Sequence, residues 1–233
     1  MESLYKETGL SDLLDDNQKL IIPERINHIR IDVGLAGNAP NAAMWLRQTN
    51  DRLVIGIEPV ELHWEHLRGR INFGDRFLPI KGAIDDVNEP TKQTFYIMES
   101  TGASSLLKPT DTHPQKLESE ITVNTFSLKF ILDHIPWDRF DYIEHIKTDC
   151  EGHDFAAVKS LGEYASKVMF ITSEVPDGHA HVGEYHFPPF GEHMKFCGFS
   201  FTSRPHEVKF TNEKLAAKIG NDFTTLDNTT VGV

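Results

Sequence analysis

The chain is poor in cysteine, in positive charge and in long apolar runs, and each shortage excludes a class of protein. It has 233 residues and only two cysteines, Cys150 and Cys197, whose separation fits neither a disulfide framework nor a zinc site. The net charge of −12 argues against binding to a nucleic-acid backbone or to an anionic membrane. No apolar run approaches the roughly 20 residues that span a bilayer, and the N-terminus lacks the pattern of a signal peptide. We therefore expect a soluble, cytoplasmic protein.

The length suits one α/β domain. Residues 1–27 are polar with scattered Leu and Ile, which predicts an N-terminal helical segment that covers an edge of a sheet. In residues 28–233, segments typical of strands alternate with segments typical of helices. That alternation predicts a mostly parallel sheet with right-handed crossovers, and hence a Rossmann-like α/β fold.

The expected elements are short and follow one another closely. Strands are predicted at 28–33, 51–57, 77–84, 94–98, 142–148, 167–173 and 199–202, with one later strand whose position is not fixed. Helices are predicted from Asn38 and Pro40 onward, at 61–69, at 126–134 and before Gly162. Long loops are expected at 108–118 and 176–193. Pro79 indicates that the third strand lies at an edge of the sheet.

Acidic and glycine residues stand where three of these strands end. Asp32 and Gly34 follow the first strand, Glu58 the second, and Asp149 the strand at 142–148. The carboxyl ends of parallel strands form the ligand-binding crevice of such a sheet. A carboxylate about 20–25 residues beyond a glycine turn accepts hydrogen bonds from ribose hydroxyls. These positions predict a cofactor with an unmodified ribose.

NAD and S-adenosyl-L-methionine both carry such a ribose, and the glycine turn separates them. Asp32 would repel a pyrophosphate, whereas it can accept hydrogen bonds from an ammonium group. The turn holds Gly34, Gly37 and Asn38, so the Gly-x-Gly-x-x-Gly spacing of dinucleotide sites is absent. Charge therefore favours S-adenosyl-L-methionine. An NAD-dependent oxidoreductase and a non-catalytic Rossmann-like binding module are the alternatives.

Four short segments carry a family resemblance. They are Asp32-Val-Gly34, Gly56-Ile-Glu58-Pro59, Gly102-Ala-Ser104-Ser105-Leu106 and Ile146-Lys147-Thr148-Asp149-Cys150-Glu151-Gly152-His153-Asp154. In this order they resemble the FkbM family of S-adenosylmethionine-dependent methyltransferases, over about residues 28–175. The resemblance implies the class I methyltransferase fold with a mostly parallel seven-stranded sheet. It also implies O-methylation of a hydroxyl on a sugar, glycan or small natural product.

The resemblance further implies roles for residues at the cofactor site. Asp32, Gly34 and Gly37 would lie at the methionine end and Glu58 at the ribose, while Ala83 and Ile84 would border the adenine. The family has a glycine where this chain has Asn38, so the turn is expected to differ in shape.

Methyl transfer is expected beside Asp149. An alcohol acceptor must lose a proton, and Asp149 and His153 are the candidate general bases. Lys147 is expected to pair with a neighbouring carboxylate and to serve the same catalytic group. Ser104, Ser105 and Glu174 are the candidate acceptor-binding residues, and residues 99–120 and 176–193 are expected to shape the acceptor site.

A divalent metal is the remaining alternative at the strand ends. Asp149 with Glu174, or with His179 and His181, offers ligands for a cation that prefers oxygen. Their spacing is unspecific, so we expect no metal and interpret the two histidines as surface residues.

Overall fold

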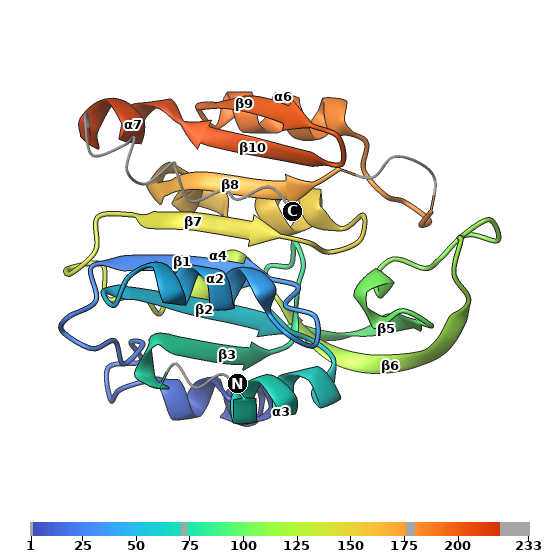
Figure 1. Ribbon diagram of the computed structural model, residues 1–233, viewed down its shortest axis with the longest axis horizontal. Coiled ribbons are helices and arrows are strands. Elements are labelled where there is room, and N and C mark those ends of the chain that lie inside the picture. The colour runs from blue at the N-terminus through green and yellow to red at the C-terminus, as the bar shows by residue number, and fades with distance from the viewer. Residues whose placement is uncertain (1, 71–73, 176–179, 220–233) are drawn as a thin grey trace.

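The computed structural model describes residues 2–70, 74–175 and 180–219. It contains a twisted seven-stranded sheet with helices on both faces, and a smaller three-stranded sheet beside it (Figure 1). The strands of the large sheet are β1 His28–Val33, β2 Arg52–Glu58, β3 Phe77–Lys81, β7 Ile143–Thr148, β8 Val168–Glu174, β9 Phe199–Arg204 and β10 Glu207–Asn212. Their order is β3-β2-β1-β7-β8-β10-β9, and only β10 runs antiparallel to its neighbours. The predicted mixed α/β fold with a mostly parallel seven-stranded sheet is confirmed.

The helices fill the connections between strands. They are α1 Glu2–Glu7, α2 Pro40–Gln48, α3 Glu61–Arg70, α4 Leu128–Leu132, α5 Asp154–Lys159, α6 Phe187–Phe196 and α7 Glu213–Ile219. Short 3-10 turns are η1 Leu10–Leu13, η2 Gly74–Arg76, η3 Thr101–Ala103 and η4 Gly162–Lys167. In Figure 1, α2 crosses in front of β1 and β2, and α4 lies behind the sheet. None of the helices in the described ranges is both long and apolar enough to cross a bilayer.

One face of the centre of the sheet packs against an apolar core. Every residue of β2 is buried, which is the pattern of a parallel strand covered on both faces. Ile29, Ile31, Leu53 and Ile55 are fully buried between the two helical layers. Close packing of this kind holds the ends of β1, β2, β7 and β8 in fixed relative positions.

The smaller sheet projects from the carboxyl edge of the large one (Figure 1). It consists of β4 Ala83–Ile84, β5 Thr91–Met98 and β6 Leu117–Phe126, in the order β4-β6-β5. The single strand predicted at 77–84 is therefore wrong, because the chain leaves β3 at Gly82 and enters β4. Gly82 has a φ of +155°, and a Cβ there would lie 2.5 Å from the Phe126 ring, so only glycine allows this change of direction. The prediction that the third strand lies at an edge is confirmed.

Two further predictions are corrected by the structure. The loop expected at 108–118 gives way at Leu117 to β6, whose outer half is exposed and therefore lacks an apolar signal. The helix expected from residue 126 begins at Leu128, because the Ser127 Oγ accepts the Phe130 N–H at 3.1 Å and caps it.

The C-terminal and N-terminal parts add local detail. The loop expected at 176–193 contains the start of α6 at Phe187, and its residues 176–179 lie outside the described ranges. The later strand that could not be placed is β10, inserted between β8 and β9. The N-terminal segment joins the β3 edge, where the Lys81 N–H donates to the Thr8 carbonyl at 2.9 Å.

Candidate functional site

A cavity of about 240 Å³ lies where the large sheet meets the small one. Gly34, Glu58, Asp149 and Glu174 reach it from the ends of β1, β2, β7 and β8. The small sheet and the loop after β5 supply the facing wall, with Ile84, Phe95, Ser104 and Leu106 among its residues. The cavity occupies the carboxyl edge of the parallel strands, as the sequence predicted for a ligand site.

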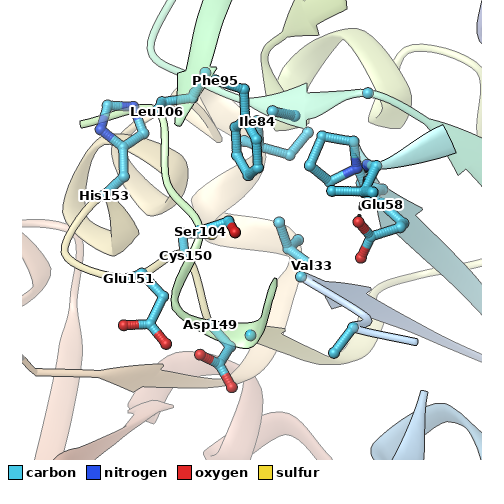
Figure 2. A pocket seen from close by; sticks show the side chains of 18 of the residues that line it. Val33, Glu58, Ile84, Phe95, Ser104, Leu106, Asp149, Cys150, Glu151 and His153 are labelled. Atoms are coloured by element: carbon cyan, nitrogen blue, oxygen red, sulfur yellow. Dashed lines mark hydrogen bonds between the residues drawn. The ribbon is translucent and has the colours of Figure 1, made fainter. Parts of the chain in front are cut away.

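One end of the cavity is apolar. Ile84, Phe95 and Leu106 gather there, on the side away from Asp149 and Glu151 (Figure 2). Ala83 and Phe95 belong to a small apolar cluster in which Leu106 also packs. A flat, weakly polar ring system is the kind of group that such a surface accepts.

Glu58 stands at the border of this apolar end (Figure 2). Its side chain is only 4% exposed, and its Oε1 accepts the Val60 N–H at 2.9 Å. The His63 Nδ1 lies 3.5 Å from the same oxygen. Both contacts are made to Oε1, so Oε2 is available to a ligand in the cavity.

The opposite end is acidic. A ligand oxygen from each of Asp149, Glu151 and Glu174 lies within 4.8 Å of the other two, and we call this group the carboxylate cluster. Figure 2 shows Asp149 and Glu151 together on this side. The Lys147 Nζ donates to Asp149 Oδ2 at 2.8 Å, which places one positive charge beside three carboxyl groups.

Burial and mutual repulsion leave the carboxylate cluster only partly ionised. Burial, with the neighbouring charges of Asp149 and Asp154, raises the pKa of Glu151 to about 7. Burial, followed by the charges of Asp149 and Glu151, raises the pKa of Glu174 to about 8. The negative charge that accumulates here above neutral pH favours a cationic ligand.

His153 also lines the cavity, on the side away from Asp149 (Figure 2). Its Nε2 lies 2.7 Å from Asp85 Oδ1. The hydrogen bond from His153 lowers the pKa of Asp85 to about 2, although burial opposes this shift. The ring is thus anchored to the turn after β4 and does not contact the carboxylate cluster.

Asp32 lies under the cavity and does not line it. Its buried Oδ2 accepts the Ala42 N–H at 3.0 Å, and burial raises its pKa to about 7. The carboxyl group therefore holds the first turn of α2. Asn38 was expected to cap this helix, but Ala39 occupies the N-cap position and Pro40 follows it.

The glycine turn after β1 is fixed by backbone contacts. Gly34 has a φ of +81°, and a Cβ there would lie 2.0 Å from the Asp149 carbonyl oxygen. The Asp149 N–H donates to the Val33 carbonyl at 3.1 Å, so the ends of β1 and β7 meet at this point. Gly37 does not line the cavity, and a Cβ on it would meet His63 Cδ2 at 3.5 Å.

The two serines of the loop after β5 have different positions. Ser104 lines the cavity, and its Oγ accepts the Met98 N–H at 3.1 Å. Ser105 lies behind the wall, where its hydroxyl donates to the Glu151 carbonyl at 2.9 Å. Ser105 thereby ties the loop to the segment that carries the carboxylate cluster.

The histidine-containing metal arrangement is not formed by the described residues. Within the described ranges, the potential metal ligands that lie close together are those of the carboxylate cluster, and none of them is a histidine. His181 is buried beside His113, with ring centroids 5.0 Å apart, and is not at the surface as predicted. His179 lies outside the described ranges.

Two cavity residues, Glu151 and Phe95, and Asp85 behind His153 were not assigned from the sequence. Glu151 stands inside the most specific segment of the resemblance, and its place between Asp149 and His153 was a usable signal. Asp85 directly follows Ala83 and Ile84, which were expected at the cofactor. Phe95 gave no signal, because the small sheet brings it to the cavity from far along the chain.

Comparisons with known proteins include remote structural matches. No family model and no curated protein matches the chain. One similar solved structure is an O-methyltransferase family 2 protein from Planctomyces limnophilus in complex with apigenin, with 10% identity and a TM-score of 0.41. It covers 87% of this chain, which spans 55% of its length. Another is the aminoglycoside resistance methyltransferase NpmB1, with 10% identity, a TM-score of 0.37 and coverage of 81% and 89%. The FkbM assignment stays a prediction.

Proposed function

We propose that the chain is an S-adenosylmethionine-dependent methyltransferase that acts on a hydroxyl group of a small molecule or glycan. The order of polarity along the cavity carries this proposal. An apolar end is followed by the Glu58 carboxylate and then by the carboxylate cluster. S-Adenosyl-L-methionine has the same order of groups: a flat base, a ribose with two hydroxyls, and a cationic sulfonium with an ammonium.

The residues present fit that cofactor. Ala83, Ile84 and Phe95 would border the adenine, and Glu58 Oε2 would accept hydrogen bonds from the ribose. Gly34 would allow the close approach of the methionine part, since its backbone has no side chain to clear. Asp32 and Gly37 would support this end indirectly, through α2 and through the turn.

The cofactor supplies a methyl group on a positively charged sulfur. The chain must align an acceptor oxygen with it and receive the acceptor's proton. Asp149 would be the general base, held by Lys147 and supported by Glu151, whose pKa of about 7 suits proton transfer near neutral pH. Ser104 and Glu174 would bind the acceptor. Ser105 would hold the loop that carries Ser104 in place, through its hydrogen bond to the Glu151 carbonyl. His153 is the alternative base, although its bond to Asp85 favours an orienting role.

The NAD-dependent oxidoreductase is disfavoured by two observations. The carboxylate cluster would lie close to the pyrophosphate and repel it. The sheet also differs from the dinucleotide-binding order of six parallel strands, because antiparallel β10 separates β8 from β9. A non-catalytic binding module would need no buried carboxyl groups at a pKa near neutrality.

Thermal unfolding with added ligands tests the proposal. S-Adenosylhomocysteine should raise the melting temperature, because a ligand bound only by the native state stabilises it. NADH at the same concentration should leave it unchanged. Stabilisation by NADH alone would overturn the methyltransferase proposal and favour the oxidoreductase.

A further inference from the structure

His63 makes two contacts that connect separate parts of the cavity wall. It belongs to α3, and its side chain is 13% exposed. On one side, its Nδ1 lies 3.5 Å from Glu58 Oε1. On the other, its Cδ2 lies 3.5 Å from the position that a Cβ on Gly37 would occupy. The imidazole therefore fills the space between the end of β2 and the glycine turn after β1.

The position of the contact on Glu58 is what matters for a ligand. The Val60 N–H donates to Oε1. The His63 Nδ1 lies 3.5 Å from the same oxygen, too far for a hydrogen bond but close enough for an ion pair when the imidazole is protonated. Both contacts leave Oε2 to a ligand. Without His63, the Val60 N–H alone would hold Oε1. A carboxylate held at one oxygen by two groups is preorganised to accept hydrogen bonds at the other.

We propose that His63 is a positioning residue for the ribose site: its imidazole orients the Glu58 carboxylate and couples it to the glycine turn. The inference rests on the proposed function, because it assumes that Glu58 receives a ribose. His63 is not one of the acidic residues at the strand ends. It stands five residues beyond Glu58, on the following helix.

Glu58 supplies the charge that acts on His63. The contact with that carboxylate and its negative charge raise the pKa of His63 against the opposing effect of burial. The turn contributes Gly37, which has no charge, and the next turn of α3 contributes His66. A protonated His63 therefore holds Glu58 most firmly at low pH, and this hold weakens as pH rises through the raised pKa.

The test measures binding of 5′-methylthioadenosine by titration calorimetry between pH 5.5 and 8.5. This probe has a ribose and no group that titrates in that range. Four variants are compared: Glu58→Ala, His63→Ala, His63→Asn and, as a control on the same helix, His66→Asn. Asn at position 63 keeps a donor near the place of Nδ1 but cannot change its charge.

His63→Ala should weaken binding at pH 5.5 by about 2–5-fold, the effect of losing one ion-pair contact that is longer than a hydrogen bond. His63→Asn should recover most of that loss and abolish the decline of affinity with pH that is expected of the natural chain, while His66→Asn leaves both unchanged. If Glu58→Ala weakens binding and His63→Ala keeps the natural affinity and pH profile, the positioning role is wrong although the ribose site stands. If the natural chain binds neither this probe nor S-adenosylhomocysteine, the proposed function is wrong and the inference falls with it.

Discussion

Strand β7 has an acidic group near its start and another just beyond its end, the first fully buried and the second partly exposed, and the two have opposite electrostatics. Near its start, Glu144 is fully buried. Its Oε1 accepts hydrogen bonds from Arg30 and Arg52, and its Oε2 accepts one from Arg52. Just beyond its end, Asp149 stands in the carboxylate cluster with Lys147 as its ion-pair partner. The first group is neutralised inside the protein, and the second holds more negative charge than the chain compensates.

The pKa shifts express this difference. Burial alone would raise the pKa of Glu144, but the hydrogen bonds and charges of Arg30 and Arg52 outweigh it and lower the pKa. At the other end, burial and neighbouring carboxylates raise the pKa of Glu151 and of Glu174. A buried acid with its own partners stabilises a fold, whereas acids crowded without partners are typical of a site that binds something from outside.

The largest effect is expected from Glu144→Gln. The substitution leaves the positive charges of Arg30 and Arg52 buried beside a neutral side chain. Removing one partner of a buried ion pair costs about 3–5 kcal/mol of unfolding free energy. Urea denaturation measures the change. Asp149→Asn is the matched control just beyond the other end of the strand, and it should change stability far less, because it removes like-charge repulsion within the carboxylate cluster together with the Lys147 ion pair. Equal losses in both variants would contradict the contrast between the two ends.

Asp149→Asn should instead lower turnover by about 10²–10⁴-fold, the usual contribution of a positioned proton acceptor. Binding of S-adenosylmethionine should fall much less. Transfer of a labelled methyl group to an acceptor found by screening measures this effect, with His153→Ala as the companion variant. Loss of turnover in His153→Ala alone would assign the base to the histidine. Unchanged turnover in both would show that the chemistry lies elsewhere.

Glu58→Ala should weaken binding of S-adenosylhomocysteine by about 1–3 kcal/mol, because charge-assisted hydrogen bonds to the ribose are lost. The fold should survive, since the side chain ends a strand and faces the cavity. Glu65→Ala, an exposed position on α3, is the control. Calorimetry that gives the same affinity for Glu58→Ala and the natural chain would exclude Glu58 as the ribose acceptor.

A further effect is expected in the pH dependence of stability. The folded chain keeps a proton on Glu174 up to about pH 8 and on Glu151 up to about pH 7, whereas an unfolded carboxyl group loses it near pH 4.3. The folded state binds more protons in that interval, so stability falls as pH rises from about 4.5 to 8. Glu174→Gln cannot ionise, and its unfolding free energy should fall less steeply over that range. If stability fell equally with pH in Glu174→Gln and the natural chain, the pKa of Glu174 would not be raised in the folded state.

The smallest effect is expected from a chelator. EDTA should leave the stabilisation by S-adenosylhomocysteine and the methyl transfer largely intact if, as we propose, the carboxylate cluster receives the cationic end of the cofactor and not a metal ion. Loss of transfer in EDTA, with recovery on addition of a divalent ion, would assign the cluster to a metal instead, with Asp149 and Glu174 as the first ligands to test.

The predictable parts of the fold were those with a local signal. β1 and β2 are short apolar runs, so the sequence identified them within one residue at each end. β6 was missed because half of it is exposed and polar, and it gains its partners only from β4 and β5.

The site divides in the same way. Glu58, Asp149 and Glu174 could be predicted because parallel strands bring their carboxyl ends to one edge. Asp32 could not be placed, because side chains alternate along a strand: Val33 lines the cavity while Asp32 faces α2. Phe95 comes from the small sheet, and only the folded chain shows that it closes the apolar end.

One measurement tests the central claim most directly: the native mass spectrum of the protein mixed with equimolar S-adenosylhomocysteine and NADH. The claim is that this cavity binds an adenosyl group joined to an amino-acid chain and rejects a pyrophosphate. It predicts a single adduct with the mass of S-adenosylhomocysteine, reduced in Glu58→Ala and retained in Glu65→Ala. An adduct with NADH alone, or no adduct with either compound, would contradict it.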